Sequence, residues 1–385
     1  MRDVLTETLH WWSAGAPVAL ATVVGTWRSS PRQPGASMLL GGDGAVVGSV
    51  SGGCVEGAVY ELAQQVVADG VPVLTRYGIS DDDAFAVGLT CGGIIDVFVE
   101  RVDQHSFPEL GDVAAAIEAG RPVAVVTTTV HPDPARVGQR RVLFGGSGVH
   151  GGDGSVRGTL GSPRCDAAVT DDAAGLLAAG RNGTLRYGPD GERLGDGMEV
   201  FVASYAPKAR MLVFGAIDFA AAAARIGHFL GYHVTVCDAR AVFATPKRFP
   251  DADEVVVAWP HQYLLAERDA GRLDERTVLC VLTHDPKFDV PLLEVALGDE
   301  GWTVRPAYVG AMGSRRTHDD RDERLRERGM TDDQLARLHS PIGLNLGART
   351  PEETAVSIAA EIIAGRWGGD GDNLTATVGA IHHPS

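Results

Sequence analysis

The sequence predicts an α/β protein with two domains, a mixed α/β domain at residues 1–205 and a doubly wound parallel sheet at residues 206–370. Three observations carry this prediction. The chain has 385 residues, which is more than one ordinary hydrophobic core accommodates. The first half mixes short β-rich runs with amphipathic helices, and its order of elements occurs twice. In the second half strands and helices alternate, which is typical of a parallel sheet.

The composition argues against several classes of protein. Hydrophobic residues make up 44% and charged residues 22%, as expected for globular domains. The net charge of −16 argues against a general nucleic-acid-binding protein, which needs a basic surface. We expect no membrane span, because no apolar run reaches roughly 18 to 20 residues, and the first residues lack a secretory h-region. The five cysteines are widely spaced, so we expect a reducing cytoplasm rather than a disulfide framework.

The elements of the first half follow from its hydrophobic pattern. In chain order we expect a helix at 1–12, β-rich runs at 17–27 and 37–50, a helix at 54–68, and strands at 73–77 and 94–99. The helix at 54–68 places its apolar residues at i, i+3, i+4 and i+7, and Gly70 ends it. This segment is therefore a mixed α/β unit.

The same order of elements recurs about 105 residues later, which predicts an internal duplication with repeats at 17–100 and 122–205. In this alignment Gly158-Thr159-Leu160 matches Gly48-Ser49-Val50, and Cys165 matches Cys54. The alternative is chance similarity within a chain that is rich in Ala, Gly and Val.

The two copies differ around their cysteines. The first copy has Ser51-Gly52-Gly53-Cys54 and Cys91-Gly92-Gly93. The second has Ser162-Pro163-Arg164-Cys165 and no second Cys-Gly-Gly. We therefore expect the first copy to hold any site and the second to act mainly as scaffold.

The second half predicts a Rossmann-like domain. The expected strands lie at 211–214, 234–237, 254–258, 277–282 and 304–309, with helices between them. The last helix begins at Thr350, where Glu353 completes a capping box, and it ends near Gly365. Residues 371–385 are rich in Gly and Asp at their start, and we expect a flexible tail.

The first copy carries the candidate binding residues Cys54, Cys91 and Arg32. Cys54 follows Ser-Gly-Gly at a helix start, where free N–H groups and the positive helix end favour a thiolate or an anion. Soft thiolates suit zinc, copper or molybdenum-type centres. Arg32 lies in a turn-rich loop and is a candidate clamp for phosphate or carboxylate. The alternatives are two small buried cysteines and a solvated surface arginine.

The first strand–helix turn of the second half is a degenerate dinucleotide motif. Gly215 and Ala220 fit the pattern Gly-x-Gly-x-x-Gly/Ala, but Ile217 replaces the second glycine and Asp218 adds a negative charge. Asp238 ends the next strand, in place for a ribose hydroxyl. The pattern predicts the fold and argues against NAD(P) binding, so this domain is structural or binds another ligand.

Two further groups follow later strands of this sheet. His284 and Asp285 come after the strand at 277–282, and Arg315 and Arg316 begin a helix after the last strand. The carboxyl edge of such a sheet is where ligands bind, so these are candidates for a second site. The alternatives are a helix-capping Asp, a core His and a solvated, charged helix.

Several longer motifs resemble the XdhC/CoxI family over nearly the whole chain. They are Ser30-Pro31-Arg32, Gly48 to Glu56, Cys91-Gly92-Gly93, Leu282 to Asp285, Tyr308 to Arg316, Ser340 to Leu344 and Pro351 to Ile358. This chain departs from the family pattern at Gly215-Ala216-Ile217-Asp218, where Gly-x-Gly-His is usual, and at Asn345, where Asp is common.

The resemblance implies an accessory factor of xanthine dehydrogenase type rather than an enzyme. Such proteins bind molybdenum cofactor, protect it during sulfuration and deliver it to molybdenum hydroxylases. The implied partners are a cofactor sulfurase and part of a molybdenum hydroxylase, and self-association as a homodimer is common in the family. Cofactor binding carries over to Cys91 and then Cys54, with the pterin or phosphate end expected at Gly52, Gly53 and Arg32. Two other hypotheses stay open, an NAD(P)-dependent oxidoreductase and a structural docking protein.

Overall fold

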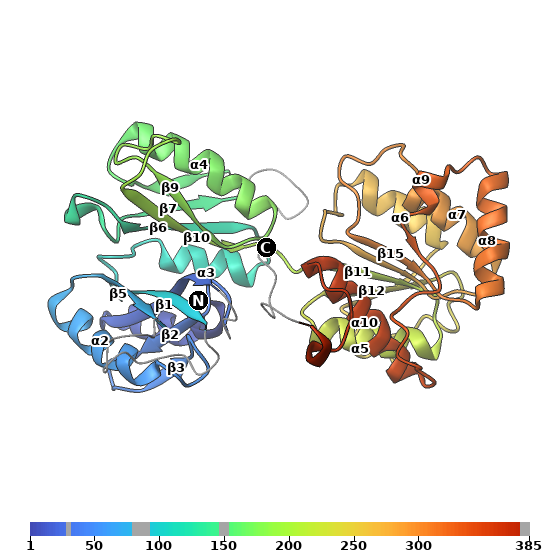
Figure 1. Cartoon of the computed structure of the whole chain (residues 1–385), viewed down its shortest axis with the longest axis horizontal. Coiled ribbons are helices and arrows are strands. Elements are labelled where there is room, and N and C mark those ends of the chain that lie inside the picture. The colour runs from blue at the N-terminus through green and yellow to red at the C-terminus, as the bar shows by residue number, and fades with distance from the viewer. Residues whose placement is uncertain (28–31, 79–92, 146–153, 378–385) are drawn as a thin grey trace. The chain divides into compact units, whose positions relative to one another are not determined.

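The computed structural model describes residues 1–27, 32–78, 93–145 and 154–377, which form two compact units. The first unit comprises Met1–Pro207, and the second begins at Lys208 (Figure 1). The predicted fold class is confirmed: two antiparallel sheets with helices precede a six-stranded parallel sheet.

The first unit contains two five-stranded sheets with the same strand order. The first sheet runs β3-β2-β1-β5-β4 and the second β8-β7-β6-β10-β9. The strands of the first sheet are β1 (Val18–Trp27), β2 (Ser37–Leu40), β3 (Val46–Gly48), β4 (Val73–Tyr77) and β5 (Ile94–Val102). Those of the second are β6 (Val123–Val130), β7 (Arg140–Phe144), β8 (Val156–Gly158), β9 (Gly183–Tyr187) and β10 (Met198–Tyr205).

One helix packs on the outer face of each sheet. The helices of this unit are α1 (Leu5–Ser13), α2 (Glu56–Asp69), α3 (Leu110–Glu118) and α4 (Pro163–Ala178), with short 3₁₀ turns η1 (Arg2–Val4) and η2 (Pro134–Arg136). The residues of α2 that pack on the first sheet are Val59, Ala63 and Val66, and those of α4 on the second are Cys165, Val169, Ala173 and Leu177. Their spacing of three or four residues is that of one helix face.

The inner faces of the two sheets share one core. A central cluster contains Val18 and Leu20 from the first sheet, Val123 and Val142 from the second, and residues of α1 and α3. Within this interface Glu100 of β5 forms a buried ion pair with Arg140 of β7. Burial raises the pKa of Glu100, and Arg140 opposes that rise.

The second unit is a parallel sheet in the order β13-β12-β11-β14-β15-β16, the strand order of a Rossmann fold. Its strands are β11 (Arg210–Phe214), β12 (His233–Asp238), β13 (Glu254–Val257), β14 (Val278–Val281), β15 (Tyr308–Ala311) and β16 (Leu338–His339). Its helices are α5 (Asp218–Phe229), α6 (Pro260–Asp269), α7 (Pro286–Leu297), α8 (Arg315–Glu327), α9 (Asp332–Leu335) and α10 (Pro351–Trp367), followed by η3 (Leu374–Ala376).

Both faces of this sheet are buried, as expected for a doubly wound sheet. Met211 and Val213 of β11 pack with α5 and α10 on one face. Leu212 and Phe214 pack with α6, α7 and α8 on the other. Because the strand order reverses between β11 and β14, a crevice for a ligand is expected at their carboxyl ends.

Among the boundaries that differ from the sequence-based expectation, two have a clear local cause. The helix expected from residue 54 begins at Glu56, because the residues before it form a turn around the Glu56 side chain. The strand expected at 304–309 lies at 308–311, since Pro306 cannot donate to the ladder and pairing with β14 begins at Tyr308. The expected capping box of Thr350 and Glu353 is confirmed.

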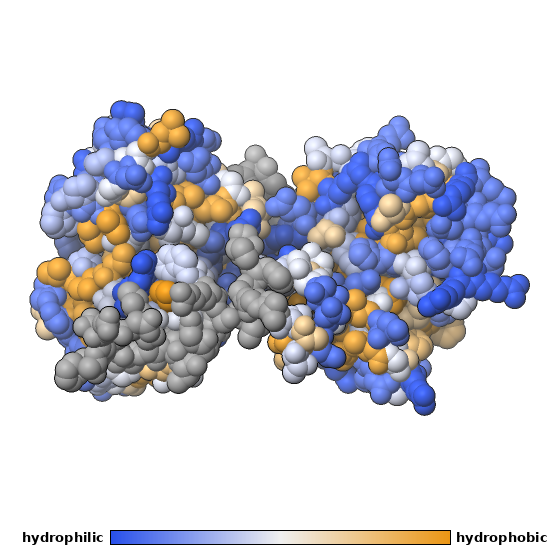
Figure 2. Space-filling model, in the orientation of Figure 1, coloured by the Kyte–Doolittle hydropathy of each residue, from blue (hydrophilic) through white to orange (hydrophobic). Residues whose placement is uncertain are grey.

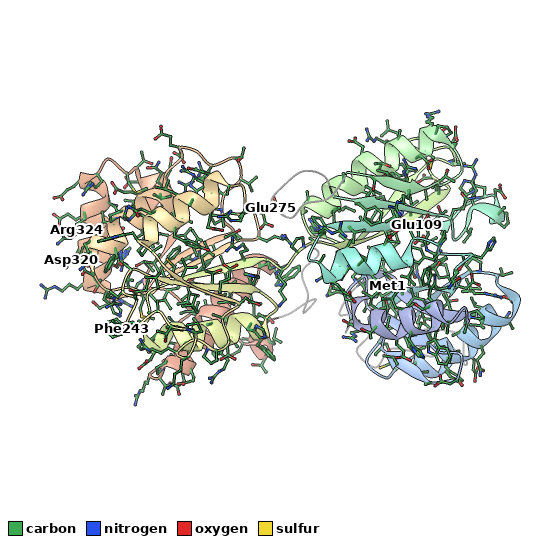
Figure 3. All side chains as sticks on the ribbon, turned by 180° about the vertical axis from the view of Figure 1, so that it is seen from behind. Met1, Glu109, Phe243, Glu275, Asp320 and Arg324 are labelled. Carbon is green, nitrogen blue, oxygen red and sulfur yellow. The ribbon has the colours of Figure 1, made fainter. Side chains whose placement is uncertain are left out.

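The charged run that begins at Arg315 forms α8, whose outward face is hydrophilic in Figure 2. Asp320 and Arg324 point away from the sheet in Figure 3, so most of this run is solvated, as expected. Among the helices of the described segments, none is long and apolar enough to cross a membrane.

Replacing Arg140 with Ala tests the contact between the two sheets. We expect the unfolding free energy of the first unit to fall by about 3–5 kcal/mol, because Glu100 is left buried without its partner. Arg157→Ala is the matched control, since Arg157 pairs with Asp112 at the surface and such pairs contribute about 1 kcal/mol or less. Urea unfolding of the full chain measures both, and equal losses would contradict the role of the buried pair.

Candidate functional site

The candidate site lies at the end of the first sheet where β1 and β4 finish and β5 begins. Trp27, the last residue of β1, is opposite Ile94, and Tyr77, the last of β4, is opposite Ile95. The turn before α2 starts at the same end, because the Ser49 N–H donates to the Ser37 carbonyl over 3.1 Å. The fold therefore places the ends of β1 and β4, the start of β5 and the turn before α2 at one end of this sheet.

The turn at residues 49–55 closes around the carboxylate of Glu56. The Ser49 hydroxyl donates to Oε1 over 2.6 Å, and the Ser51 N–H donates to the same oxygen over 2.9 Å. The Gly53 N–H and the Ser51 hydroxyl donate to Oε2. Burial by itself would raise the pKa of Glu56, but these hydrogen bonds lower it to about 2.

The turn before the helix does not offer the free N–H groups that the sequence suggested. The N–H groups of residues 52–55 donate to the Ser49 hydroxyl, the Glu56 carboxylate and the Ser51 hydroxyl. The expectation that these four groups hold an external anion is therefore corrected, because Glu56 already supplies a negative charge at this position.

What the turn does expose is its glycine backbone and one thiol. Gly52 and Gly53 have φ values of +80° and +118°, and within the described residues a Cβ on either would have no heavy atom within 4 Å. A ligand can thus approach the backbone there closely. Cys54 is half-buried and packs at the margin of the core that contains Val55 and Tyr77.

The second half of the unit keeps the turn but not the cysteine. Thr159 and Leu160 donate to the carboxylate of Asp166 over 2.9 and 2.7 Å, as Ser49 and Val50 do to Glu56. Asp166 thus takes the place of Glu56. The predicted alignment of Cys165 with Cys54 is therefore wrong by one position.

In the corrected alignment Cys165 corresponds to Val55, and both are fully buried. Arg164 corresponds to Cys54. Matching the two cysteines by residue type misplaced them, because a small buried position accepts either Cys or Val. The second half therefore has no cysteine at the position that corresponds to Cys54.

The other cysteines in the described segments are inert. Burial raises the pKa of Cys165 to about 11, with a smaller contribution from Asp166. Burial likewise raises the pKa values of Cys237 and Cys280 to about 12. Among the described cysteines, only Cys54 is not fully buried.

The remaining residues of this predicted site fall in different places. Cys91 and Gly92 lie outside the described residues. Gly93 is buried before β5, and its carbonyl oxygen lies 2.1 Å from where a Cβ on Gly78 would stand. Arg32 is partly exposed, with a guanidinium nitrogen 4.0 Å from the Asp3 carboxylate.

Sequence reasoning missed a rigid aromatic–arginine pair at the same edge. Arg76 lies 4.5 Å from the centroid of the Trp27 ring, and two hydrogen bonds of 2.6 and 2.7 Å tie its guanidinium to Asp96. Trp27 is 40% exposed. The alternating strand pattern was the available signal, since it puts Arg76 and Asp96 opposite one another. In the described residues, no group of His, Cys, Asp or Glu side chains could hold a metal ion.

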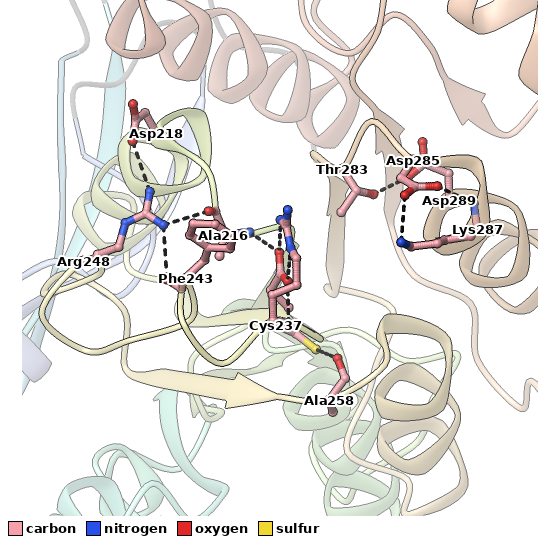
Figure 4. A network of polar contacts seen from close by, with 12 residues as sticks. Ala216, Asp218, Cys237, Phe243, Arg248, Ala258, Thr283, Asp285, Lys287 and Asp289 are labelled. Atoms are coloured by element: carbon pink, nitrogen blue, oxygen red, sulfur yellow. Dashed lines mark hydrogen bonds and ion pairs between the residues drawn. The ribbon is translucent and has the colours of Figure 1, made fainter.

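In the second unit, groups of the dinucleotide-like turn are hydrogen-bonded within the chain (Figure 4). Gly215 has a φ of +112°, and a Cβ on it would lie about 3.0 Å from atoms of Thr283 and Leu282. Both features favour glycine at this position. Asp238 is buried and accepts from the Ala216 N–H over 2.7 Å, while Arg240 binds both of its oxygens. The expectation of an Asp238 carboxylate open to ribose is therefore corrected. Ile217 precedes α5, and Asp218 is its first residue.

The second-site candidates lie on two helix starts. Asp285 accepts from the Lys287 N–H and caps α7, whereas His284 is exposed. Arg315 and Arg316 are exposed at the start of α8. The structure does not join these four residues through any hydrogen bond or ion pair within the described chain.

The buried pair under these loops is another that sequence reasoning missed. Asp289 of α7 and Arg321 of α8 form an ion pair of 3.1 Å, and Thr283 donates to the same carboxylate. Arg321 also donates to the Ser340 hydroxyl over 3.0 Å and to the Met312 carbonyl over 2.7 Å. This network fixes the loops at the carboxyl ends of β14, β15 and β16.

Comparison with known proteins gives matches in both units. A family described as the XdhC and CoxI family matches residues 11–78 and 116–188, and one described as the XdhC Rossmann domain matches residues 211–362. These matches confirm the resemblance that the motifs indicated.

Two known proteins and one solved structure are similar over almost the full length. A protein of Bacillus subtilis named as a probable subunit of xanthine dehydrogenase is 28% identical over 351 residues, covering 90% of this chain and 92% of that protein. The molybdenum cofactor insertion chaperone PaoD of Escherichia coli is 24% identical over 365 residues, covering 95% and 88%. A crystal structure described as a xanthine dehydrogenase from Bacillus halodurans has a TM-score of 0.66 and 25% identity, covering 97% of this chain and 98% of that one.

Glu56→Gln tests the turn. We expect the unfolding free energy near neutral pH to fall by about 1–3 kcal/mol, because the amide accepts through one oxygen where the carboxylate uses two. The folded-state pKa of Glu56 is lowered from 4.5 to about 2, so its stabilisation is complete above 4.5 and disappears as the pH falls towards 2. The difference between variant and wild type should therefore shrink over that range.

Urea unfolding at neutral pH and near pH 3 measures this difference. Glu61→Gln is the control on the exposed face of the same helix, and it should change stability by less than about 0.5 kcal/mol. A Glu56→Gln effect of equal size at both pH values would refute the proposed role of the ionised carboxylate.

Thiol labelling tests the exposure of Cys54. In the native full chain, iodoacetamide should modify Cys54 at least about 100-fold faster than Cys165, Cys237 and Cys280, because those three are buried with raised pKa values. Peptide mapping by mass spectrometry separates the sites. Denatured protein is the control, in which all four should react alike, and native labelling of Cys165 at the rate of Cys54 would contradict the structure.

Proposed function

We propose that this chain, which belongs to the XdhC and CoxI family, binds molybdenum cofactor as cargo and transfers it to a molybdenum hydroxylase. Its similarity to a molybdenum cofactor insertion chaperone and to a protein named as part of xanthine dehydrogenase supports an accessory role. The observation that carries the proposal is the pair of glycines beside Cys54 in the turn before α2, where the matching turn of the second half has Ser162-Pro163-Arg164 instead.

The residues at this edge suit such a cargo. The cofactor combines a sulfur-ligated metal with a planar pterin and a phosphate. The open backbone at Gly52 and Gly53 allows a flat ring to approach, and the exposed indole of Trp27 is a stacking surface.

The finer parts of the proposal assign individual roles. Cys91 contacts or protects the metal, while Cys54, Gly52 and Gly53 hold the pterin and Arg32 the phosphate. Because the N–H groups of Gly52, Gly53 and Cys54 are occupied, the phosphate is assigned to the Arg32 side chain and not to the backbone of this turn.

We infer the partners, the oligomeric state and the location of this chain from its family. The recipient is a hydroxylase of the xanthine or carbon monoxide dehydrogenase type, a sulfurase acts on the bound cofactor, and the chain works as a homodimer in the cytoplasm. An oxidoreductase function is less well supported, because the Asp238 carboxylate is bonded to Ala216 and Arg240.

Retention of released cofactor tests the proposal. Purified full chain is mixed with molybdenum cofactor under anaerobic conditions, and gel filtration with metal analysis measures how much molybdenum co-elutes. We expect Cys91→Ser and Cys54→Ser each to reduce retention by about tenfold or more, since each removes one thiolate contact.

Arg164→Ser is the matched control, because Arg164 occupies the position of Cys54 in the second half and should retain cofactor like the wild type. No retention by the wild type would overturn the function. Full retention by a cysteine variant would overturn the role of that cysteine alone.

A further inference from the structure

A cluster of two arginines and a phenylalanine lies at the carboxyl edge of the parallel sheet, in the second unit and outside the proposed cargo site. The guanidinium carbons of Arg240 and Arg248 lie 4.9 and 5.7 Å from the centroid of the Phe243 ring. Phe243 is 43% exposed, and the neighbouring Val242 is more exposed still. Figure 3 labels Phe243, and Figure 4 shows it beside Arg248. We call these three residues the Arg-Phe-Arg cluster.

The cluster adjoins the turn before α5, which departs from a dinucleotide-binding turn. The Ala216 N–H of this turn donates to the Asp238 carboxylate. The Ala216 carbonyl accepts from Arg248 over 3.1 Å. Asp218 adds a negative charge at the start of α5. Asp218 therefore disfavours a phosphate at the helix start itself.

Both arginines are held in place before any ligand binds. Arg240 donates through Nε and Nη2 to the two oxygens of Asp238, over 2.9 and 2.7 Å. Burial would raise the pKa of Asp238, but Arg240 and the Ala216 N–H lower it, so the pair stays ionised. Arg248 donates to the carbonyls of Ala216 and Phe243 and to the Asp218 carboxylate.

Each guanidinium still has donors to offer. Within the described residues, the Nη1 group of Arg240 and the Nε group of Arg248 make no hydrogen bond. Fixed guanidiniums bind phosphate with little loss of side-chain entropy. The exposed ring and the neighbouring Val242 give an apolar surface on which a base can lie.

We propose that the Arg-Phe-Arg cluster binds a nucleoside monophosphate, with the phosphate on the free guanidinium donors and the base against the exposed part of Phe243 and Val242. The Asp218 carboxylate at the start of α5 disfavours the second phosphate of a dinucleotide in its usual position. The inference is independent of the cargo site, because it uses residues of the second unit only.

Calorimetric titration of the full chain tests this binding. The probes are adenosine 2′-monophosphate, adenosine 5′-monophosphate, adenosine and inorganic phosphate. We expect at least one monophosphate to bind saturably with a Kd below about 1 mM. Adenosine and inorganic phosphate should each bind about tenfold more weakly or worse, since each makes only part of the contacts. Equal affinity for inorganic phosphate would show a simple anion site and overturn the role of Phe243.

Variants locate the site. Arg248→Gln and Phe243→Leu should each weaken monophosphate binding by about tenfold, whereas Lys247→Gln should not. Lys247 is the matched control because it is an exposed cation next to Arg248. If Arg248→Gln destabilises the fold in a thermal melt, Phe243→Leu still tests the proposed site, because it leaves every charge unchanged.

Three results would overturn the proposal. They are no saturable binding of either monophosphate up to about 10 mM, an equal loss with Lys247→Gln, and unchanged binding by Phe243→Leu. Cys54→Ser should leave monophosphate binding unchanged, so failure here is distinguishable from failure of the cargo proposal.

Discussion

The first unit depends on the packing of its two antiparallel sheets against each other. Each sheet covers its outer face with one helix, α2 or α4, but its inner face is apolar and needs a partner. The shared core supplies that partner, and the ion pair of Glu100 and Arg140 sits within it. Neither half can bury its inner face alone, so both must persist even if only one binds a ligand.

That constraint explains the pattern of differences between the halves. The turn before the helix is kept in both, closed by Glu56 in one and Asp166 in the other, because an open turn would leave N–H groups without partners. The residues that face outward are free to diverge. Cys54 and Arg164 occupy the same position, and only the first offers a thiol at an open glycine backbone.

The second unit shows the same separation of framework and surface. The pair of Asp289 and Arg321 is buried and ties together the ends of three strands. Asp238 at the end of β12 has a similar structural role, because its carboxylate accepts from the Ala216 N–H after β11 and from Arg240. The groups that remain exposed at this edge include Arg248 and Phe243 as well as the Asp218 carboxylate.

The sequence by itself determined the fold class, most element positions, the final capping box and the family. These follow from local periodicity, turn residues and long motifs, which do not depend on distant contacts. Only the tertiary structure decided which side chains are available. It showed that Glu56 accepts from N–H groups of the turn expected to bind an anion, that the Asp238 carboxylate is bonded to Ala216, and that Cys165 is a core residue at the position of Val55. Hydrogen-bond partners and burial are set by residues brought together in space, so residue type and spacing could not distinguish a scaffold cysteine or aspartate from a functional one.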